Sequence, residues 1–210
     1  MPVSDTNSQS MTDRIVDLIA SGDLSRAERV KEVEISERLG VSRIPLREAM
    51  RKLESQGVLE ARERGGMNVK AFSAKQIKEL SDVRAALEPI AMREAAPAFR
   101  KKENRIALNA IIEEMKWAAS HKNRQAIALA DIEFHSFLME LSGNDLIRNI
   151  WSGLRLQLQI VFSLELCIPT NLEDVVPKHL ALRDLLLRED LTGLEQLVVG
   201  HVRPELNITN

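Results

Sequence analysis

The sequence lacks the features that mark secreted, redox-active or membrane-spanning proteins. Its single cysteine, Cys167, cannot form an internal disulfide, and apolar neighbours predict that the thiol is buried and inert. No apolar run approaches about 18 residues, and the first residues lack the basic-then-apolar pattern of a signal peptide. We therefore expect a cytoplasmic protein with no membrane partner and no redox chemistry.

Charge is spread unevenly along the 210-residue chain. The formal net charge of −2 argues against wholesale coating of nucleic acid. Residues 38–70, however, hold eight Lys or Arg and four Asp or Glu, whereas residues 73–210 hold 17 basic and 19 acidic side chains. This local basic surplus divides the chain into two functional parts.

Residues 30–69 carry two short helical patterns that meet at Gly40 and lead into a glycine-bounded hairpin. Apolar residues recur at helical spacing, so both helices should face one small core. These residues are Ile35 and Leu39 on the first helix and Leu46, Ala49, Met50 and Leu53 on the second. Ser42 can cap the second helix, and Pro45 falls in its first turn, where a missing N–H costs little. The pattern is that of a winged helix-turn-helix.

The second of these helices also carries a basic face. Arg43, Arg47 and Arg51 recur every four residues, which places them on one side of the helix, offset from the apolar stripe. A basic helical face beside a turn is what reading of the DNA major groove requires. The sequence therefore predicts double-stranded DNA as the partner of this segment.

Two further elements should complete the DNA-binding part. A helix over residues 11–20 is expected to cover the back of the helix-turn-helix, because Ile15, Leu18 and Ile19 share one face. Farther along, the segments VLEAR and MNVKAF flank a Gly-Gly turn. Their alternation predicts a two-stranded wing.

From Ser73 onward the pattern is helical throughout. Ser73 is a candidate N-cap, and Pro89 is expected to kink or end the first helix. The apolar stripe of that helix is Ile77, Leu80, Val83, Leu87 and Ile90. Further helices are expected near residues 103–120, 123–141, 145–166, 175–189 and 192–203. The predicted fold is mainly α, with a winged helix-turn-helix in residues 1–72 and an all-helical bundle in residues 73–210.

Three of the four histidines form a pattern with one aspartate. Asp131 and His135 lie four residues apart, so they project from the same face of a predicted helix. His179 and His201 each lie 11 residues from Asp190, where the turn between their helices is expected. An antiparallel hairpin about that turn would bring the two imidazoles level. Together these side chains would offer three nitrogen ligands and one oxygen ligand inside a helical bundle.

Such ligands suit Zn²⁺, with Ni²⁺ or Mn²⁺ as alternatives, and an expanded coordination shell leaves positions for a small molecule. A second interpretation makes Asp131 and His135 a helix-surface pair and the other histidines unrelated. His121, between helices, is expected to be a solvated loop residue. A metal-dependent hydrolase or lyase is a third interpretation. Against it stands the lack of a general base, because Glu133 points away from both ligands on its helix.

The segment ERLGVSRIPLREAMRKLESQGVLE resembles the DNA-binding domain of the GntR family of bacterial transcription regulators. The C-terminal half resembles the FCD ligand-binding domain of the FadR-like branch, through DIEFH at residues 131–135, SGN at residues 142–144, His179 and His201. The resemblance covers nearly the whole chain. It implies a homodimeric regulator, a repressor more often than an activator, that binds a palindromic operator. A small organic or sugar acid, bound near a metal, would change its DNA affinity.

The resemblance also assigns DNA contacts. The residues assigned are Ser42, Arg43 and Arg47 at the start of the recognition helix, with Arg51 on the same face, and Arg62, Arg64, Gly65 and Gly66 in the wing. The chain departs from the family at Val33, where an arginine usually contacts DNA, so one contact is in doubt. Arg26 and Ala27 replace a frequent Pro-Gly, and only nine residues follow His201.

Two residues match positions in the family's effector pocket. Arg84 would pair bidentately with a carboxylate of the effector; its alternative role is a salt bridge to Glu88, four residues on. Asn144 follows a glycine and could instead simply terminate a turn. A regulator that responds to the metal alone is the remaining alternative to an acid-responsive one.

Overall fold

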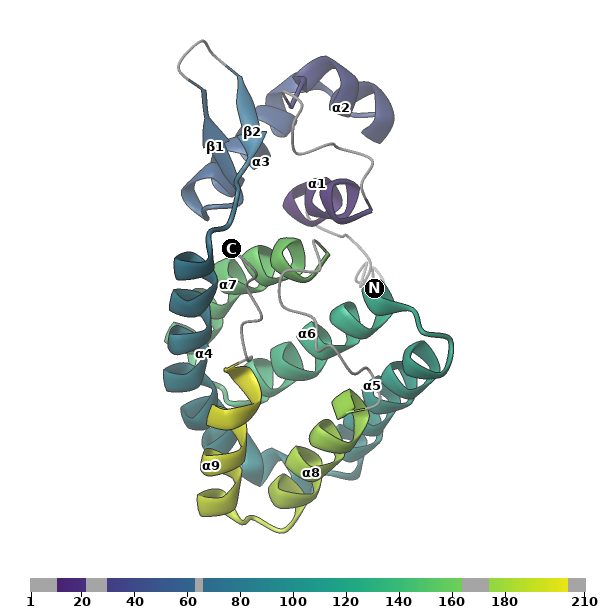
Figure 1. Ribbon diagram of the computed structural model, residues 1–210, viewed down its shortest axis with the longest axis vertical. Coiled ribbons are helices and arrows are strands. Elements are labelled where there is room, and N and C mark those ends of the chain that lie inside the picture. The colour runs from purple at the N-terminus through teal and green to yellow at the C-terminus, as the bar shows by residue number, and fades with distance from the viewer. Residues whose placement is uncertain (1–10, 22–29, 63–65, 164–173, 204–210) are drawn as a thin grey trace, which may run out of the picture. The chain divides into compact units, whose positions relative to one another are not determined.

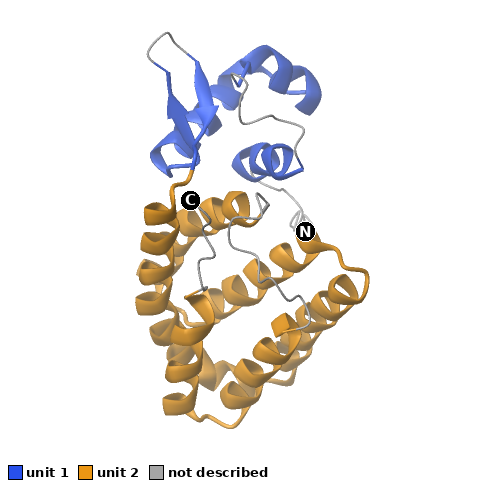
Figure 2. Cartoon of the chain, in the orientation of Figure 1, with its two compact units in different colours: residues 1–71 blue, residues 72–210 orange. Residues whose placement is uncertain are grey.

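The computed structural model describes residues 11–21, 30–62, 66–163 and 174–203. Of the residues singled out above, Arg26, Ala27, Arg64, Gly65 and Cys167 lie outside these ranges. The chain divides into two compact units, residues 1–71 and residues 72–210 (Figure 2). None of the helices within the described ranges has both the length and the apolar character needed to cross a membrane.

The first unit contains α1 (Met11–Ala20), α2 (Glu32–Leu39) and α3 (Arg43–Ser55) (Figure 1). Its first helix has the predicted bounds and packs against α3 through a buried apolar face. The guanidinium of Arg14 on α1 donates to the carbonyl of Leu39 at the end of α2 (2.9 Å). Gly40 then ends α2 in the left-handed conformation, with φ of 64°, which a residue without Cβ adopts readily. The tight turn into α3 depends on this residue.

The apolar stripe of α3 is buried as predicted, but its N-terminal cap differs from the expectation. Ser42 occupies the capping position, yet its side chain makes no capping hydrogen bond. A capping oxygen commonly accepts from the third residue of the helix, and here that residue is Pro45, which has no N–H. The hydroxyl of Ser42 is therefore not used by the helix, and the side chain is exposed.

The predicted wing is present. Strands β1 (Leu59–Ala61) and β2 (Met67–Val69) pair antiparallel, with Leu59 opposite Val69. Val30 extends the pairing by one bridge, in which its N–H donates to the carbonyl of Met67 (2.8 Å). The sequence contains no sign of this bridge, because a single paired residue leaves no periodic pattern.

The second unit is helical throughout its described residues. Its elements are α4 (Ala74–Ala95), the 3₁₀ helix η1 (Ala96–Arg100), α5 (Lys102–Ser120), α6 (Arg124–Leu141), α7 (Asp145–Ser163), α8 (Val175–Leu187) and α9 (Leu191–Val202) (Figure 1). Ser73 caps α4 as predicted, in a reciprocal capping box with Gln76. Helix α6 packs against α4, α5 and α7, and its Phe134 and Leu138 are fully buried in the core.

Helix α4 corrects part of two predictions. It does not end at Pro89 but continues to Ala95, because packing against α6 and α9 offsets the hydrogen bond that proline cannot make; a kink at Pro89 stays a prediction. Its predicted apolar stripe is wrong in part: Val83 and Ile90 are 44% and 39% exposed, whereas Arg84 and Glu88 are buried. The buried face is therefore rotated toward two charged side chains, which can be buried because they pair with each other.

Helices α8 and α9 form the expected hairpin. Asp190 caps α9 by accepting the N–H of Gly193 (3.0 Å). A Cβ at position 193 would lie 2.7 Å from Oδ2 of Asp190, so glycine is the residue that lets this cap close. The turn thereby sets how the two helices are aligned.

Candidate metal centre and DNA-reading helix

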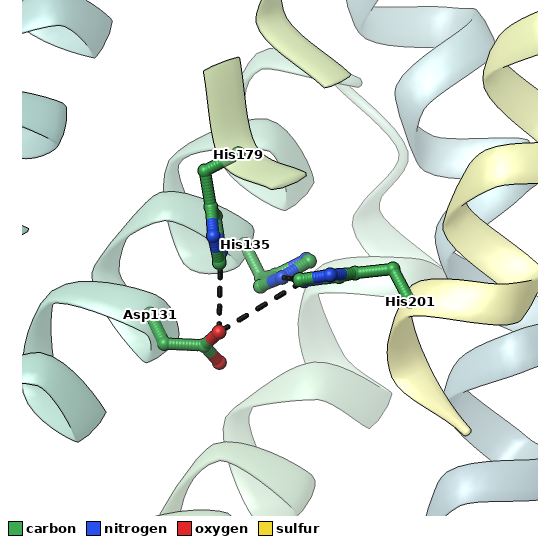
Figure 3. Close-up of side chains that lie close together, drawn as sticks. All are labelled: Asp131, His135, His179 and His201. Carbon is green, nitrogen blue, oxygen red and sulfur yellow. Dashed lines mark hydrogen bonds and ion pairs between the residues drawn. The ribbon is translucent and has the colours of Figure 1, made fainter. Parts of the chain in front are cut away.

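The four predicted metal ligands lie together in the second unit (Figure 3). Helix α6 supplies Asp131 and His135, α8 supplies His179 and α9 supplies His201. Each offers one ligand atom, and these atoms all lie within 4.8 Å of one another. The interpretation of the histidines as unrelated is therefore wrong, since the hairpin does bring His179 and His201 level above α6.

The hydrogen bonds of His179 direct a lone pair toward Asp131. Its Nδ1–H donates to the carbonyl of Val175 (2.8 Å), so Nε2 of the neutral ring carries no proton. That Nε2 is buried, has no hydrogen-bond partner among the described residues, and lies 3.1 Å from Oδ1 of Asp131. Two acceptor atoms so close repel each other unless a cation lies with them. Ligands about 2.0–2.1 Å from one zinc ion lie roughly 3 Å apart, so the spacing fits a shared metal.

The other two histidines complete the cluster. Nε2 of His135 lies 3.2 Å from Nε2 of His201, and the latter lies 3.9 Å from Oδ1 of Asp131. On the far side of its ring, Nδ1 of His135 lies 2.6 Å from Oε2 of Glu88. A carboxylate behind a ligating imidazole is a common outer-shell arrangement in metal sites.

The electrostatics of the cluster favour the forms of these side chains that bind metals. Burial raises the pKa of Asp131, but a hydrogen bond from a protonated Nε2 of His179, with the positive charges of His135, His179 and Arg84, outweighs it and holds this pKa well below its ordinary value; a metal ion in place of that proton would act in the same direction. Burial, with His179 and His135 nearby, holds the pKa of His201 well below its ordinary value. The cluster therefore presents a carboxylate and a neutral imidazole, which fit a divalent ion of the zinc type.

The salt-bridge alternative for Arg84 is confirmed. Its Nε–H donates to Oε1 of Glu88 at 2.5 Å, and both side chains are buried. The guanidinium carbon also lies 5.9 Å from the ring centroid of Trp151, within reach of a cation–π contact. Glu88 links the guanidinium to the cluster, because its other carboxylate oxygen lies 2.6 Å from Nδ1 of His135.

Asn144 has a structural role at the start of α7. Its Oδ1 accepts the N–H of Ile147 (3.2 Å), and its Nδ2 donates to Glu94 of α4 (3.0 Å). An effector contact for Asn144 stays a prediction. His121 lies exposed at the end of α5, stacked on Trp117, and is not part of the cluster.

The predicted DNA-contacting residues that the structure describes are exposed. They are Ser42, Arg43, Arg47, Arg51, Arg62 and Gly66. Arg47 is held by Glu32 of α2 (Nε to Oε2, 2.6 Å), and Arg62 donates to Asn68 across the wing (3.1 Å). The sequence interpretation overlooked Ile44, which is 73% exposed between these arginines. The exposure of Ile44 could have been predicted, because this residue lies outside the apolar stripe of α3.

Comparisons with known proteins give the same two-part organisation. The model of bacterial regulatory proteins of the gntR family matches residues 7–69, and that of the FCD domain matches residues 79–204. A Paenarthrobacter nicotinovorans protein described as a probable D-xylose utilization operon transcriptional repressor is 31% identical over 205 residues, or 97% of this chain and 89% of that protein. The gluconate operon transcriptional repressor of Bacillus licheniformis is 28% identical over 137 residues, or 65% of this chain and 56% of that protein.

A solved structure shares the fold. Escherichia coli McbR/YncC superposes with a TM-score of 0.80 at 18% identity, covering 91% of each chain. The family models together match most of the chain, and the relatives are transcription regulators. This chain therefore belongs to the GntR family, in its FCD-containing FadR-like branch, and is a DNA-binding transcription regulator rather than an enzyme.

Proposed function

We propose that the protein is a repressor whose operator affinity is controlled by a small organic or sugar acid bound beside a divalent metal ion. Residues 1–72 form the DNA-binding domain, and residues 73–210 form the effector-binding and dimerisation domain. The observation that carries the proposal is the clustering of Asp131, His135, His179 and His201, in which the buried Nε2 of His179 lies 3.1 Å from Oδ1 of Asp131. Relatives named for D-xylose and gluconate operons support a sugar-derived effector.

The metal is held by Asp131, His135, His179 and His201. Zinc suits three imidazoles and one carboxylate, with nickel and manganese as alternatives. When bound, the ion supplies positive charge for a carboxylate of the effector. The guanidinium of Arg84, which pairs with the carboxylate that contacts His135, offers a second cationic group. Asn144 is the other proposed effector contact.

The DNA contacts come from the exposed face of α3 and from the wing. Arg43, Arg47 and Arg51 meet phosphates or base edges in the major groove, assisted by Ser42. Arg62, Arg64 and the backbone of Gly66 hold the wing at the adjacent groove. A single recognition helix covers one half-site, so a palindromic operator requires two chains related by a two-fold axis.

Exposed apolar side chains on two neighbouring helices support the proposed homodimer. We call it the α4–α7 face; its residues are Val83, Ile90, Leu146 and Ile150, which are 44%, 39%, 69% and 42% exposed. The two helices pack together, and the hydrogen bond from Asn144 to Glu94 joins them at this end. A second copy of the chain would cover these side chains in a self-complementary contact.

Leu146→Asp is expected to convert the dimer into a monomer, because a carboxylate in an apolar interface loses its hydration without a partner. Light scattering coupled to gel filtration measures the mass directly. Ile106→Asp is the matched control, since Ile106 is 58% exposed on α5, away from the α4–α7 face. A Leu146→Asp protein that stays dimeric would show that another surface pairs the chains.

The proposed function is tested by gel-shift titration with operator DNA from the neighbouring promoter. We expect zinc-loaded protein to bind, and sugar acids to release it, because an effector that favours one arrangement of the reading heads opposes DNA reciprocally. Metal and acids are titrated separately. Dependence on metal alone would identify a metal-responsive regulator instead, and failure to bind any promoter fragment at low salt would contradict the assignment of the operator.

A further inference from the structure

Glu88 is a buried carboxylate with a charged or polar partner on each oxygen. Oε1 accepts Nε–H of Arg84 at 2.5 Å, and Oε2 lies 2.6 Å from Nδ1 of His135. The side chain of Glu88 is 0% exposed and that of Arg84 is 6% exposed. A buried carboxylate in this position joins two elements, because Arg84 is its neighbour on α4 whereas His135 belongs to α6.

The contact with Glu88 determines which nitrogen of His135 carries the proton. Neither Oε2 of Glu88 nor Nδ1 of His135 has another hydrogen-bond partner among the described residues, and the two atoms lie 2.6 Å apart. An ionised carboxylate only accepts hydrogen bonds, so the proton between these two atoms belongs to Nδ1. In the neutral ring, Nε2 then holds the lone pair. Nε2 is the atom that faces the cluster, 3.2 Å from Nε2 of His201.

We infer that Glu88 is a positioning residue that locks His135 in its metal-binding tautomer and joins this ligand to Arg84. The inference rests on the proposed function, in which His135 binds the metal and Arg84 the effector. One carboxylate then contacts both a ligand of the ion and a cation beside it. A shift of Arg84 toward an effector carboxylate moves Glu88, and through it the imidazole of His135.

Glu88→Gln gives this role a specific signature. Arg84 has only donors, so the glutamine must turn its carbonyl oxygen toward Arg84 and its amide NH₂ toward His135. The amide then donates to Nδ1 and moves the ring proton to Nε2, the atom that should bind the metal. Glu88→Ala removes the contact without imposing the wrong tautomer. A purely structural role predicts the opposite order, because glutamine preserves volume and alanine leaves a cavity.

The test measures the ring tautomer and the metal affinity of the full chain. In ¹⁵N NMR spectra of the metal-free protein, we expect His135 to carry its proton on Nδ1 in the wild type and on Nε2 in Glu88→Gln. In competition with a chromophoric chelator, Zn²⁺ affinity should fall by about 10–100-fold in Glu88→Gln, as for other outer-shell changes, and by less in Glu88→Ala. Glu94→Gln, on the same helix but bonded to Asn144, is the matched control and should leave both readouts unchanged.

A double variant separates tautomer control from damage to the fold. With Arg84→Met added to Glu88→Gln, the glutamine can turn its oxygen to His135, so Zn²⁺ affinity should recover relative to the single variant. Unchanged His135 signals in Glu88→Gln, or Zn²⁺ affinity equal to wild type, would overturn the inference. Were the wild type to bind no Zn²⁺, the proposed function would fail, and the tautomer measurement alone would decide the role of Glu88.

Discussion

His179→Ala is expected to weaken Zn²⁺ binding by about 100-fold or more, since loss of a direct ligand should exceed the effect of most outer-shell changes. The remaining Asp131, His135 and His201 would leave the ion one protein ligand short. Elemental analysis of the wild type should find one divalent ion per chain, and chelator competition gives the affinity of each variant. Titrations with Ni²⁺ and Mn²⁺ would rank the alternative ions.

His121→Ala is the control for this experiment. His121 is a histidine of the same unit but lies exposed beside Trp117, outside the cluster, so its loss should leave the affinity unchanged. The metal should also stabilise the fold, by about 2.7 kcal/mol at 100 times its dissociation constant, in the wild type and in His121→Ala. Equal affinities for His121→Ala and His179→Ala, or an absence of bound metal in the wild type, would contradict the assignment.

Arg43→Ala and Arg47→Ala are each expected to cost about 1–3 kcal/mol of operator binding, which is roughly 5–150-fold in the dissociation constant. Both side chains are exposed on α3, so their removal leaves its buried stripe intact. Gel-shift or anisotropy titrations at several salt concentrations provide the measurement. A base contact would relax discrimination at one operator position, whereas a phosphate contact would mainly lower the salt dependence by about one ion.

Two controls accompany the arginine variants. Arg105→Ala removes the same charge from an exposed site on α5, where the guanidinium donates to the carbonyl of Arg100, and should bind DNA as the wild type does. Glu32→Gln removes the negative charge that holds Arg47 in the unbound protein, although the amide oxygen can still accept from it, and should strengthen DNA binding modestly. Full operator discrimination by Arg47→Ala would remove Arg47 from the reading face.

Much of the fold follows from local patterns. The helix over Met11–Ala20, the capping box at Ser73 and the wing all rest on spacing and turn residues within a few positions of one another. The buried face of α4 did not follow from its local pattern. The apolar pattern favours Val83 and Ile90, but the structure buries Arg84 and Glu88, because two charged side chains that pair with each other along the helix can be buried.

The clustering of the four side chains could be predicted from their spacing in the sequence. Equal distances from the turn at Asp190 placed His179 and His201 level, and a separation of four residues placed Asp131 beside His135. The contact between Glu88 and His135 was not predictable, since 47 positions separate the two residues and only the packing of α4 on α6 brings them together. Local spacing predicted which side chains cluster, whereas only tertiary packing shows which residue contacts His135 from behind.

The cap between Asp190 and Gly193 fixes the residue at which α9 begins, and so fixes how α9 is aligned with α8. Each residue of an α-helix advances the side chain by about 100° around the axis, so one insertion between this cap and His201 would swing its imidazole out of the cluster. A change in the chain length near the cap would therefore remove His201 from the cluster, although His201 itself is unchanged.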